Sequence, residues 1–182
     1  MDKMKKKIAL IGYGVIGKRV ADAIALQNDM ELVGVCDVIS DWRIQTAVKK
    51  GYLVYAASDE AKVSMEQVGI PLAGGMGELL DISDLVVDCT PKKVAAKNVE
   101  TYKARKIKFI LQGGEKHETT GHSFSAENNY ASGLNRESTR VVSCNTTSIL
   151  RSLTALKKAD LLENARGTLL RRATDPWESH LG

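Results

Sequence analysis

The sequence has few cysteines and no long hydrophobic run. Its 182 residues include three cysteines, Cys36, Cys89 and Cys144, an odd number without C-x-x-C spacing. This pattern argues against a disulfide framework and against zinc, so we expect no bound metal and a reducing, cytoplasmic location. The apolar run from Ile8 to Ile11 is far too short for the core of a signal peptide. No apolar stretch is long enough to cross a membrane, so we expect no membrane partner.

The sequence also lacks a strong excess of charge. The formal net charge is +4, and the one basic run, Lys5-Lys6-Lys7, immediately precedes a predicted strand. A solvated strand edge explains that run better than nucleic-acid binding does. Hydrophobic residues make up 43% of the chain and charged residues 26%, which is typical of a globular protein with a real core. The length fits one domain, or one domain and the start of another.

The first third of the chain has the pattern of a βαβ unit. A short apolar strand, 7–11, leads directly into Gly12-Tyr13-Gly14-Val15-Ile16-Gly17, and a helical pattern follows over 15–27. A second strand, 31–36, ends at Asp37. A G-x-G-x-x-G motif between a strand and a helix, with an acid at the end of the next strand, indicates a dinucleotide site.

Each glycine of this motif has a separate role in a dinucleotide site. Gly12 permits the tight turn, Gly14 lets the backbone approach a pyrophosphate, and Gly17 lets the helix pack on the strand. The pyrophosphate would then lie at the helix N-terminus. Asp37 can accept hydrogen bonds from the adenosine ribose and would repel a 2′-phosphate, which favours NAD over NADP. A Rossmann-like domain that binds another nucleotide, or none, is the alternative.

Further strands and helices alternate along the chain and indicate an α/β fold with a mostly parallel, Rossmann-type sheet. We expect strands at 53–57, 85–89, 108–111 and 139–142, helices at 41–50, 59–68, 76–80 and 92–106, and a loop at Gly74-Gly75. The residues after these strands, Thr90-Pro91 and Gln112 to Lys116, should share the ligand-binding rim with the glycine motif. Gly113 and Gly114 suggest either close approach of the backbone to a ligand or only a turn.

Cys144 is the candidate nucleophile. It follows a β-prone run and precedes a helical run, so it should stand at a helix N-terminus, where backbone N–H groups and the helix dipole favour a thiolate. A small buried apolar role is the alternative. Together with a dinucleotide site, such a cysteine suggests oxidation of an aldehyde through a thioester.

Several segments resemble the archaeal (type II) phosphorylating glyceraldehyde-3-phosphate dehydrogenases. They are the glycine motif continued to Val20, Asp88-Cys89-Thr90-Pro91, Gln112-Gly113-Gly114-Glu115-Lys116, Val141 to Thr147, and Arg171 to Pro176. The resemblance implies Cys144 as the nucleophile, with Ser143 and Asn145 lining the aldehyde site. It also implies Val15 and Ile16 at the pyrophosphate, with Gly114 and Arg172 near the cofactor. We also expect a strand at 167–173. Apart from the resemblance, the two arginines at 171 and 172 in it could equally well bind an anionic ligand or be ordinary surface residues.

The family reaction would convert glyceraldehyde 3-phosphate and inorganic phosphate to 1,3-bisphosphoglycerate with NAD or NADP, in a homotetramer. Aspartate-semialdehyde dehydrogenase, an architectural cousin, and a non-catalytic NAD-binding module are the alternatives.

This chain departs from the family in two respects. Family members often carry a lysine at the position of Asp37, and their chains are nearly twice as long. We therefore expect a dinucleotide-binding domain at 1–142 and only the start of an α+β catalytic domain at 143–182. None of His117, His122 and His180 matches the general base of the family, and solvated or loop positions are expected for all three.

Overall fold

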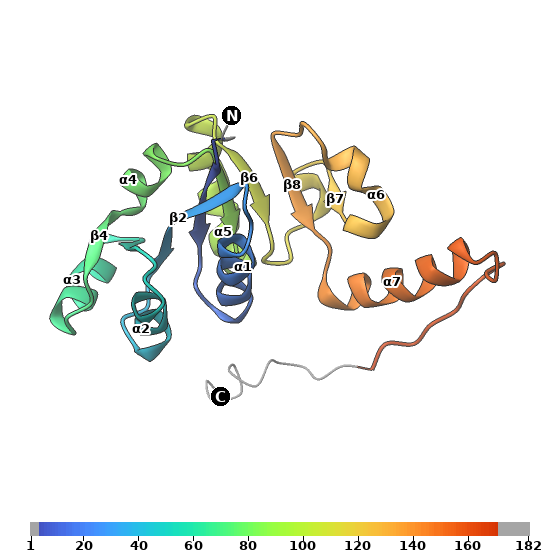
Figure 1. Ribbon diagram of the computed structural model, residues 1–182, viewed down its shortest axis with the longest axis horizontal. Coiled ribbons are helices and arrows are strands. Elements are labelled where there is room, and N and C mark those ends of the chain that lie inside the picture. Colours follow the sequence, from blue (N-terminus) through green and yellow to red (C-terminus); the bar gives the residue numbers. More distant parts are fainter. Residues whose placement is uncertain (1–3, 171–182) are drawn as a thin grey trace. The chain divides into compact units, whose positions relative to one another are not determined.

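The computed structural model describes residues 4–170 (Figure 1). Contacts divide the chain into two compact units, Met1–Val142 and Ser143–Gly182. In the first unit strands and helices alternate, in the order β1 (Lys6–Ile11), α1 (Val15–Ala25), β2 (Met30–Asp37), α2 (Trp42–Lys49), β3 (Val54–Ala56), α3 (Asp59–Gln67), β4 (Leu72–Gly75), α4 (Met76–Asp81), β5 (Leu85–Asp88), α5 (Lys92–Ala104), β6 (Lys108–Leu111), a 3-10 turn η1 (His117–Thr119), β7 (Ser123–Phe124), α6 (Ala126–Gly133) and β8 (Ser138–Val141).

The strands of the described residues form one eight-stranded sheet in the order β4-β3-β2-β1-β5-β6-β8-β7. Every pairing in it is parallel. The order runs outward from β1 in both directions, with β2 on one side and β5 on the other. That reversal is the switch point beyond which ligands of doubly wound sheets bind. The α/β, Rossmann-type fold expected from the sequence is confirmed (Figure 1).

Two hydrophobic cores lie on the two faces of the sheet. Alternate residues of β1 point to opposite faces: Ile8 and Leu10 join the core formed with α1, α2 and α3, whereas Ala9 and Ile11 join the core formed with α4 and α5. Burial on both faces explains why the strands read as nearly continuous apolar runs rather than as an alternation with polar residues.

The sequence placed most of these elements correctly, with shifts of one or two residues at their ends. Ser58 caps α3, because its Oγ accepts a hydrogen bond from the N–H of Ala61 at 3.2 Å. The loop expected at Gly74-Gly75 is wrong. Both glycines belong to β4, where Gly74 pairs with Tyr55 and Gly75 pairs with Ala56. Glycine has a low strand propensity, and pairing with β3 overrides it.

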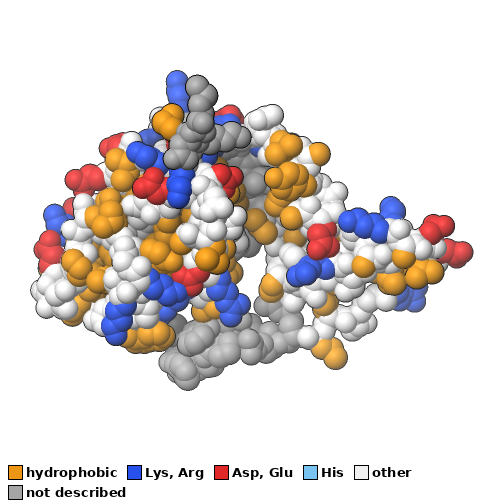
Figure 2. Space-filling view, in the orientation of Figure 1, with side chains coloured by type: hydrophobic (Ala, Val, Ile, Leu, Met, Phe, Trp, Pro, Cys, Tyr) orange, Lys and Arg blue, Asp and Glu red, His pale blue; other side chains and the backbone are white. Residues whose placement is uncertain are grey.

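The second unit contains α7 (Cys144–Lys158), which begins at the residue expected from the sequence. Residues 167–170 form no strand, and the rest of the strand expected at 167–173 lies outside the described residues. None of the residues of α7 is buried. Hydrophobic side chains lie on the surface of this unit (Figure 2), namely those of Ile149, Leu156, Leu161, Leu169 and Leu170. Across the described residues, no helix combines the length and the apolar character that a membrane span requires.

The packing of α1 on β1 depends on Gly17. A Cβ atom added there would lie 1.9 Å from the carbonyl oxygen of Gly12 and 3.0 Å from its carbonyl carbon. Because these neighbours are backbone atoms, they cannot give way as the end of a flexible side chain can. Gly14, three residues earlier, has no atom within 4 Å of such a Cβ. A methyl group should therefore lower the stability of the fold at Gly17 but change it little at Gly14.

We expect Gly17→Ala to lower the free energy of unfolding by about 1–3 kcal/mol, the usual cost of overpacking a tight contact, or to prevent folding. Gly14→Ala, which places its methyl group in open space, is the matched control and should stay within about 1 kcal/mol of the wild type. Guanidinium unfolding measures both values. Equal stability of the two variants would show that the packing of α1 does not depend on Gly17.

Candidate functional site

The turn between β1 and α1 is built on Gly12. Its φ angle is +89°, a left-handed conformation that glycine adopts at little cost. Its N–H donates to the carbonyl oxygen of Cys36 at 2.8 Å. A Cβ atom at Gly12 would lie 2.9 Å from the backbone of both Cys89 and Thr90. Only glycine therefore lets this turn lie against the end of β5.

The N-terminus of α1 is open to an anion. Gly14 is the N-cap, no side chain caps the helix, and its first turn carries no acidic residue. The side chains of Val15 and Ile16 are 43% and 49% exposed. The helix therefore presents backbone donors and the positive end of its dipole beside a glycine with open space around it. These are the features that a pyrophosphate group requires.

Asp37 stands at the end of β2 and is bonded to the glycine turn. Its Oδ2 accepts from the N–H of Tyr13 at 2.5 Å, and its Oδ1 accepts from the N–H groups of Val38 and Ile39 at 2.7 and 3.2 Å. A carboxylate offers about four acceptor positions, so roughly one is left over for a hydroxyl group such as that of a ribose. Asp37 therefore holds the glycine turn in place through its hydrogen bond from Tyr13, besides standing where a ribose is expected. The sequence did not indicate the first of these roles.

The loop after β5 is held by the buried carboxylate of Asp88. The Oδ1 atom accepts from the N–H and the hydroxyl of Thr90 at 2.8 and 2.6 Å. The Oδ2 atom accepts from the amide of Asn98 at 3.0 Å and from the hydroxyl of Tyr102 at 2.7 Å. Burial, followed by the charge of Asp88, raises the pKa of Tyr102. Four donors offset the cost of burying the carboxylate and fix the Thr90-Pro91 loop against α5.

The two glycines after β6 have different roles. A Cβ atom at Gly113 would lie 2.1 Å from the carbonyl oxygen of Thr90, so this glycine permits close approach to the protein's own backbone. Gly114 has a φ of +86° and no atom within 4 Å of the Cβ position. The turn interpretation is therefore sufficient for Gly113, whereas Gly114 leaves space that a ligand can occupy.

Glu115 lies in the segment expected at the ligand-binding rim, but the sequence assigned it no individual role. It is 3% exposed, and its Oε2 accepts from the N–H of Gly113 at 3.1 Å. Its Oε1 has no hydrogen-bond partner among the described residues. Burial, followed by the nearby charge of Asp88, raises the pKa of Glu115. An isolated glutamate in a loop carries no periodic signal, so only the tertiary structure identifies it.

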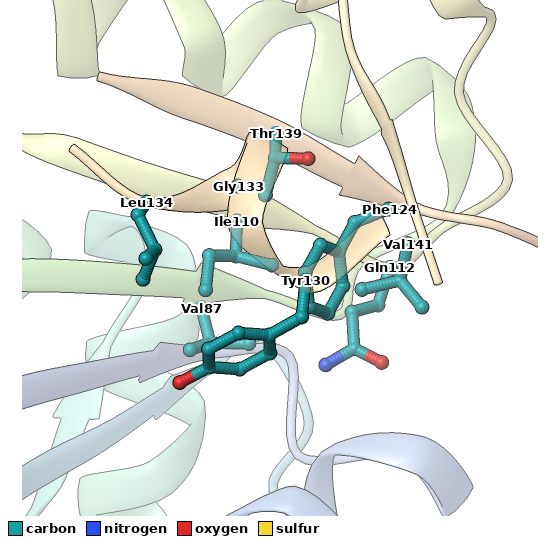
Figure 3. A pocket seen from close by; sticks show the side chains of 9 residues that line it. All are labelled: Val87, Ile110, Gln112, Phe124, Tyr130, Gly133, Leu134, Thr139 and Val141. Atoms are coloured by element: carbon teal, nitrogen blue, oxygen red, sulfur yellow. The ribbon is translucent and has the colours of Figure 1, made fainter. Parts of the chain in front are cut away.

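An apolar cavity of about 310 Å³ lies over β5, β6 and β8 (Figure 3). Side chains from these strands, from β7 and from α6 line it: Val87, Ile110, Gln112, Phe124, Tyr130, Gly133, Leu134, Thr139 and Val141. Apart from Gln112, which begins the segment after β6, the cavity contains no residue of the glycine turn or of the loops predicted to bind a cofactor. Among the described residues, the exposed cofactor candidates Gly14, Val15, Ile16 and Gly114 therefore lie outside this cavity.

Cys144 is the first residue of α7 in the second unit. Ser143 is the N-cap of this helix, and its Oγ lies 3.3 Å from the donating N–H of Thr146 and 2.9 Å from the hydroxyl of Thr146. Cys144 is exposed and Asn145 is half-buried. The position at a helix start is confirmed, and the alternative of a buried apolar cysteine is wrong. Cys36, by contrast, is buried, and burial raises the pKa of Cys89 to about 12.

The histidines and Arg172 complete the predicted set. His117 is exposed, and His122 lies in the loop before β7, as the expectation of a solvated or loop position allows, although His122 is only 7% exposed. Its ring nitrogens lie 2.7 Å from the hydroxyl of Thr139 and 2.9 Å from that of Ser132. Burial, followed by the charges of Arg136 and His117, lowers the pKa of His122. His180 and Arg172 lie outside the described residues. Those residues contain no group of three or more histidine, cysteine or acidic side chains arranged for a metal ion.

We expect Glu115→Gln to raise the free energy of unfolding at pH 7, because it removes a buried charge one of whose oxygens has no hydrogen-bond partner among the described residues. The folded-state pKa of Glu115 lies above the unfolded value of about 4.3, so the wild type gains stability as the pH falls through it, and the gain is complete below the unfolded value. The advantage of the variant should therefore vanish near pH 4. Guanidinium unfolding at both pH values measures it, with the exposed Glu118→Gln as control. A variant no more stable than the wild type at pH 7 would contradict this reading.

We expect iodoacetamide to modify Cys144 well before the other two cysteines in the folded chain. Cys144 is exposed, whereas Cys36 is buried and the pKa of Cys89 is raised to about 12. Peptide mass spectrometry after short labelling at pH 7.5 measures the order, and labelling in guanidinium, where all three should react, is the control. Modification of Cys89 or Cys36 at the rate of Cys144 would contradict the burial described above.

Comparison with known proteins finds similarity to a family model, to curated proteins and to a solved structure. The family model described as dihydrodipicolinate reductase, N-terminus, matches residues 6–146. Among curated proteins, the glyceraldehyde-3-phosphate dehydrogenase of Methanothermus fervidus is 46% identical over 177 residues, and that of Methanococcoides burtonii is 48% identical over 178 residues. These matches cover 97% and 98% of this chain, but 52% and 53% of those proteins. The chain therefore spans about half the length of the curated relatives it matches.

Among solved structures, the crystal structure of GenD2 from gentamicin A biosynthesis in complex with NAD has a TM-score of 0.46 at 17% identity. It covers 62% of this chain and 28% of that one, a likeness too low to support an argument. The resemblance to archaeal glyceraldehyde-3-phosphate dehydrogenases seen in the sequence is confirmed by the curated relatives. By the match over residues 6–146, the chain belongs to the family described as dihydrodipicolinate reductase, N-terminus.

Proposed function

We propose that this chain provides the NAD-binding part of a phosphorylating glyceraldehyde-3-phosphate dehydrogenase, an oxidoreductase. One observation carries the proposal: identity of 46% to 48% with proteins of that name extends over 97% or more of the chain. A match of that extent takes in both the glycine turn and the segment around Cys144. The Rossmann-type sheet and the exposed cysteine at a helix start support the same activity.

The cofactor proposed for the open N-terminus of α1 is NAD, and the residues present fit it. The amides at Val15 and Ile16 would hold the pyrophosphate, the open backbone at Gly14 would let it approach, and Asp37 would bind the adenosine ribose. When bound, NAD supplies the nicotinamide ring that accepts a hydride. Gly114 is proposed beside the cofactor because its Cβ position is open. Arg172 is proposed there from the family resemblance alone.

Cys144 is proposed to carry the covalent chemistry. Its thiolate forms a C–S bond to the aldehyde carbon of glyceraldehyde 3-phosphate, the C=O π electrons move to the oxygen, and that oxygen takes up a proton to give a hemithioacetal. The hemithioacetal would then become a thioester by giving up a hydride, which bound NAD would accept, and its hydroxyl proton, which a base would accept. An oxygen of inorganic phosphate then attacks the thioester carbon, the C–S bond breaks, and 1,3-bisphosphoglycerate and the thiolate are released. Ser143 and Asn145 flank the nucleophile and are proposed to line the aldehyde site.

The same resemblance supplies the biological setting. We propose that the whole protein works in glycolysis or gluconeogenesis as a homotetramer in the cytoplasm. The proton transfers would use a general-base histidine that none of the histidines of this chain matches. We therefore expect this chain to bind the cofactor at the open turn without turning over the substrate, because turnover also needs the proton transfers.

We expect the purified 182-residue chain to bind NAD in a calorimetric titration but to show little or no turnover with glyceraldehyde 3-phosphate, NAD and phosphate. Gly14→Ala should weaken NAD binding about tenfold or more (~1.4 kcal/mol), because the added methyl group occupies the approach of the pyrophosphate. Cys144→Ser is the matched control, since it should leave NAD affinity unchanged.

Each other outcome has a distinct meaning. Turnover by the wild type that disappears in Cys144→Ser would contradict the expectation that this chain has no general base for the proton transfers. Binding of neither NAD nor NADP would contradict the cofactor proposal. NAD binding by this chain, with no turnover even when the corresponding full-length reading frame is expressed, would favour the non-catalytic NAD-binding module.

A further inference from the structure

Two cations stand near the end of β2, beside the proposed adenosine end of the cofactor. Lys18, on α1, places its ammonium 4.6 Å from the centre of the Trp42 ring and 5.8 Å from that of Tyr13. Arg43 lies in the first turn of α2, six residues after Asp37. A positive side chain in this region is what a Rossmann site uses to accept the 2′-phosphate of NADP.

The guanidinium of Arg43 is already bound to a carboxylate. Its Nε lies 3.1 and 2.9 Å from the two carboxylate oxygens of Asp41, and its Nη2 lies 2.6 Å from Oδ2. Such a two-pronged pair is the strongest geometry that arginine forms with a carboxylate. Both side chains remain more than 40% exposed, so the pair lies at the surface where a ligand can reach it.

Besides its ion pair with Arg43, Asp41 has a structural role in α2. It is the N-cap of α2, and its Oδ1 accepts from the backbone N–H of Arg43 at 2.8 Å. Asparagine and serine cap helices about as well as aspartate, but neither carries the charge that holds a guanidinium. Substitution by either residue therefore removes the ion pair while keeping the cap.

The charges in this region act on one another. The pKa of Arg43 is raised, first by its hydrogen bond to Asp41 and further by the charges of Asp41 and Asp37. The pKa of Asp41 is lowered, first by the hydrogen bond to Arg43 and to a smaller degree by the charge of Lys18. Two carboxylates and two cations thus lie within electrostatic range, and each cation already has a partner. A phosphate group entering here would meet two negative charges, an arginine already bonded to a carboxylate, and Lys18, whose ammonium lies over two aromatic rings.

We propose that Asp41 is a specificity-determining residue, which keeps the site selective for NAD by holding the guanidinium of Arg43 away from a 2′-phosphate. The inference rests on the proposed function, because it concerns the adenosine end of the same cofactor site. Asp37 alone would not exclude the 2′-phosphate of NADP, because the positive charge of an unpaired Arg43, six residues away, would offset the negative charge of Asp37. Asp41 completes the exclusion of the phosphate.

The test is a calorimetric titration of the full 182-residue chain with NAD and with NADP, in the wild type and in Asp41→Asn. We expect the affinity for NADP relative to NAD to rise about tenfold or more in the variant, with NAD affinity changed less than about twofold. The gain should shrink at high salt, because it comes from the attraction between exposed charges. Asp41→Ser, which also keeps the cap, should give the same result if Asp41→Asn folds poorly.

Two controls identify the source of the gain. Adding Arg43→Gln to Asp41→Asn should abolish it, whereas Arg43→Gln alone should leave the ratio nearly unchanged. Asp81→Asn removes a carboxylate from another surface ion pair, with Arg105. Asp81 ends α4 and Arg105 follows α5, so that pair lies at the amino ends of the strands, away from the site. This variant should not change the ratio.

The outcomes separate this inference from the proposed function. NAD binding with an NADP-to-NAD ratio that stays within twofold in both Asp41 variants would overturn the role of Asp41 and leave the proposed function standing. A gain that survives Arg43→Gln would also overturn it. Binding of neither nucleotide by the wild type would contradict both proposals together.

Discussion

The arrangement of the site depends on backbone packed directly against backbone at the carboxyl ends of three adjacent strands. The turn after β1 lies against the loop after β5 because Gly12 has no side chain, and the loop after β6 lies against the same loop through Gly113. Gly17 brings α1 equally close to β1. A methyl group at any of these three positions would force the loops apart. The open N-terminus of α1 is held at the switch point of the sheet because nothing larger than hydrogen separates these segments.

Carboxylates then fix what the glycines bring together. Asp37 bonds the end of β2 to the turn through the N–H of Tyr13, and Asp88 bonds the loop after β5 to α5 with four donors. Both groups are well supplied with donors, so their charge costs little. Glu115 is the exception, since one of its oxygens is buried without a partner among the described residues. Hydrogen bonds and close backbone contacts therefore fix the loops after β1 and β5, whereas the segment after β6 carries a carboxyl group with one buried oxygen that lacks a partner among the described residues.

The sequence predicted the parts of this structure that depend on local pattern. The strands of the parallel sheet read as apolar runs, the glycine motif marked its turn, and the change from a β-prone run to a helical run placed Cys144 at a helix start. The elements that it missed have no local signal. The turn η1 and the strand β7 are too short for any period, and β4 contains two glycines that only the pairing with β3 makes extended.

Side chains whose surroundings come from distant segments were also missed. His122 is buried by contacts with Thr139 and Ser132, which are 17 and 10 residues away, and the glycine turn meets Asp37 across 24 residues. The ion pair of Asp41 and Arg43 is local, but a spacing of two residues at a helix start is too common to indicate a function. The roles of the individual site residues therefore stay predictions that rest on this geometry and on the family resemblance.

We propose that the nucleotide binds at the open N-terminus of α1 and not in the apolar cavity over β5, β6 and β8. Amide chemical-shift mapping of the ¹⁵N-labelled 182-residue chain during an NAD titration distinguishes the two places. We expect the largest shifts on the amides of Gly14, Val15 and Ile16, with smaller ones near Asp37 and Gly114. Shifts confined to residues that line the cavity, such as Val87, Ile110 and Tyr130, would contradict it.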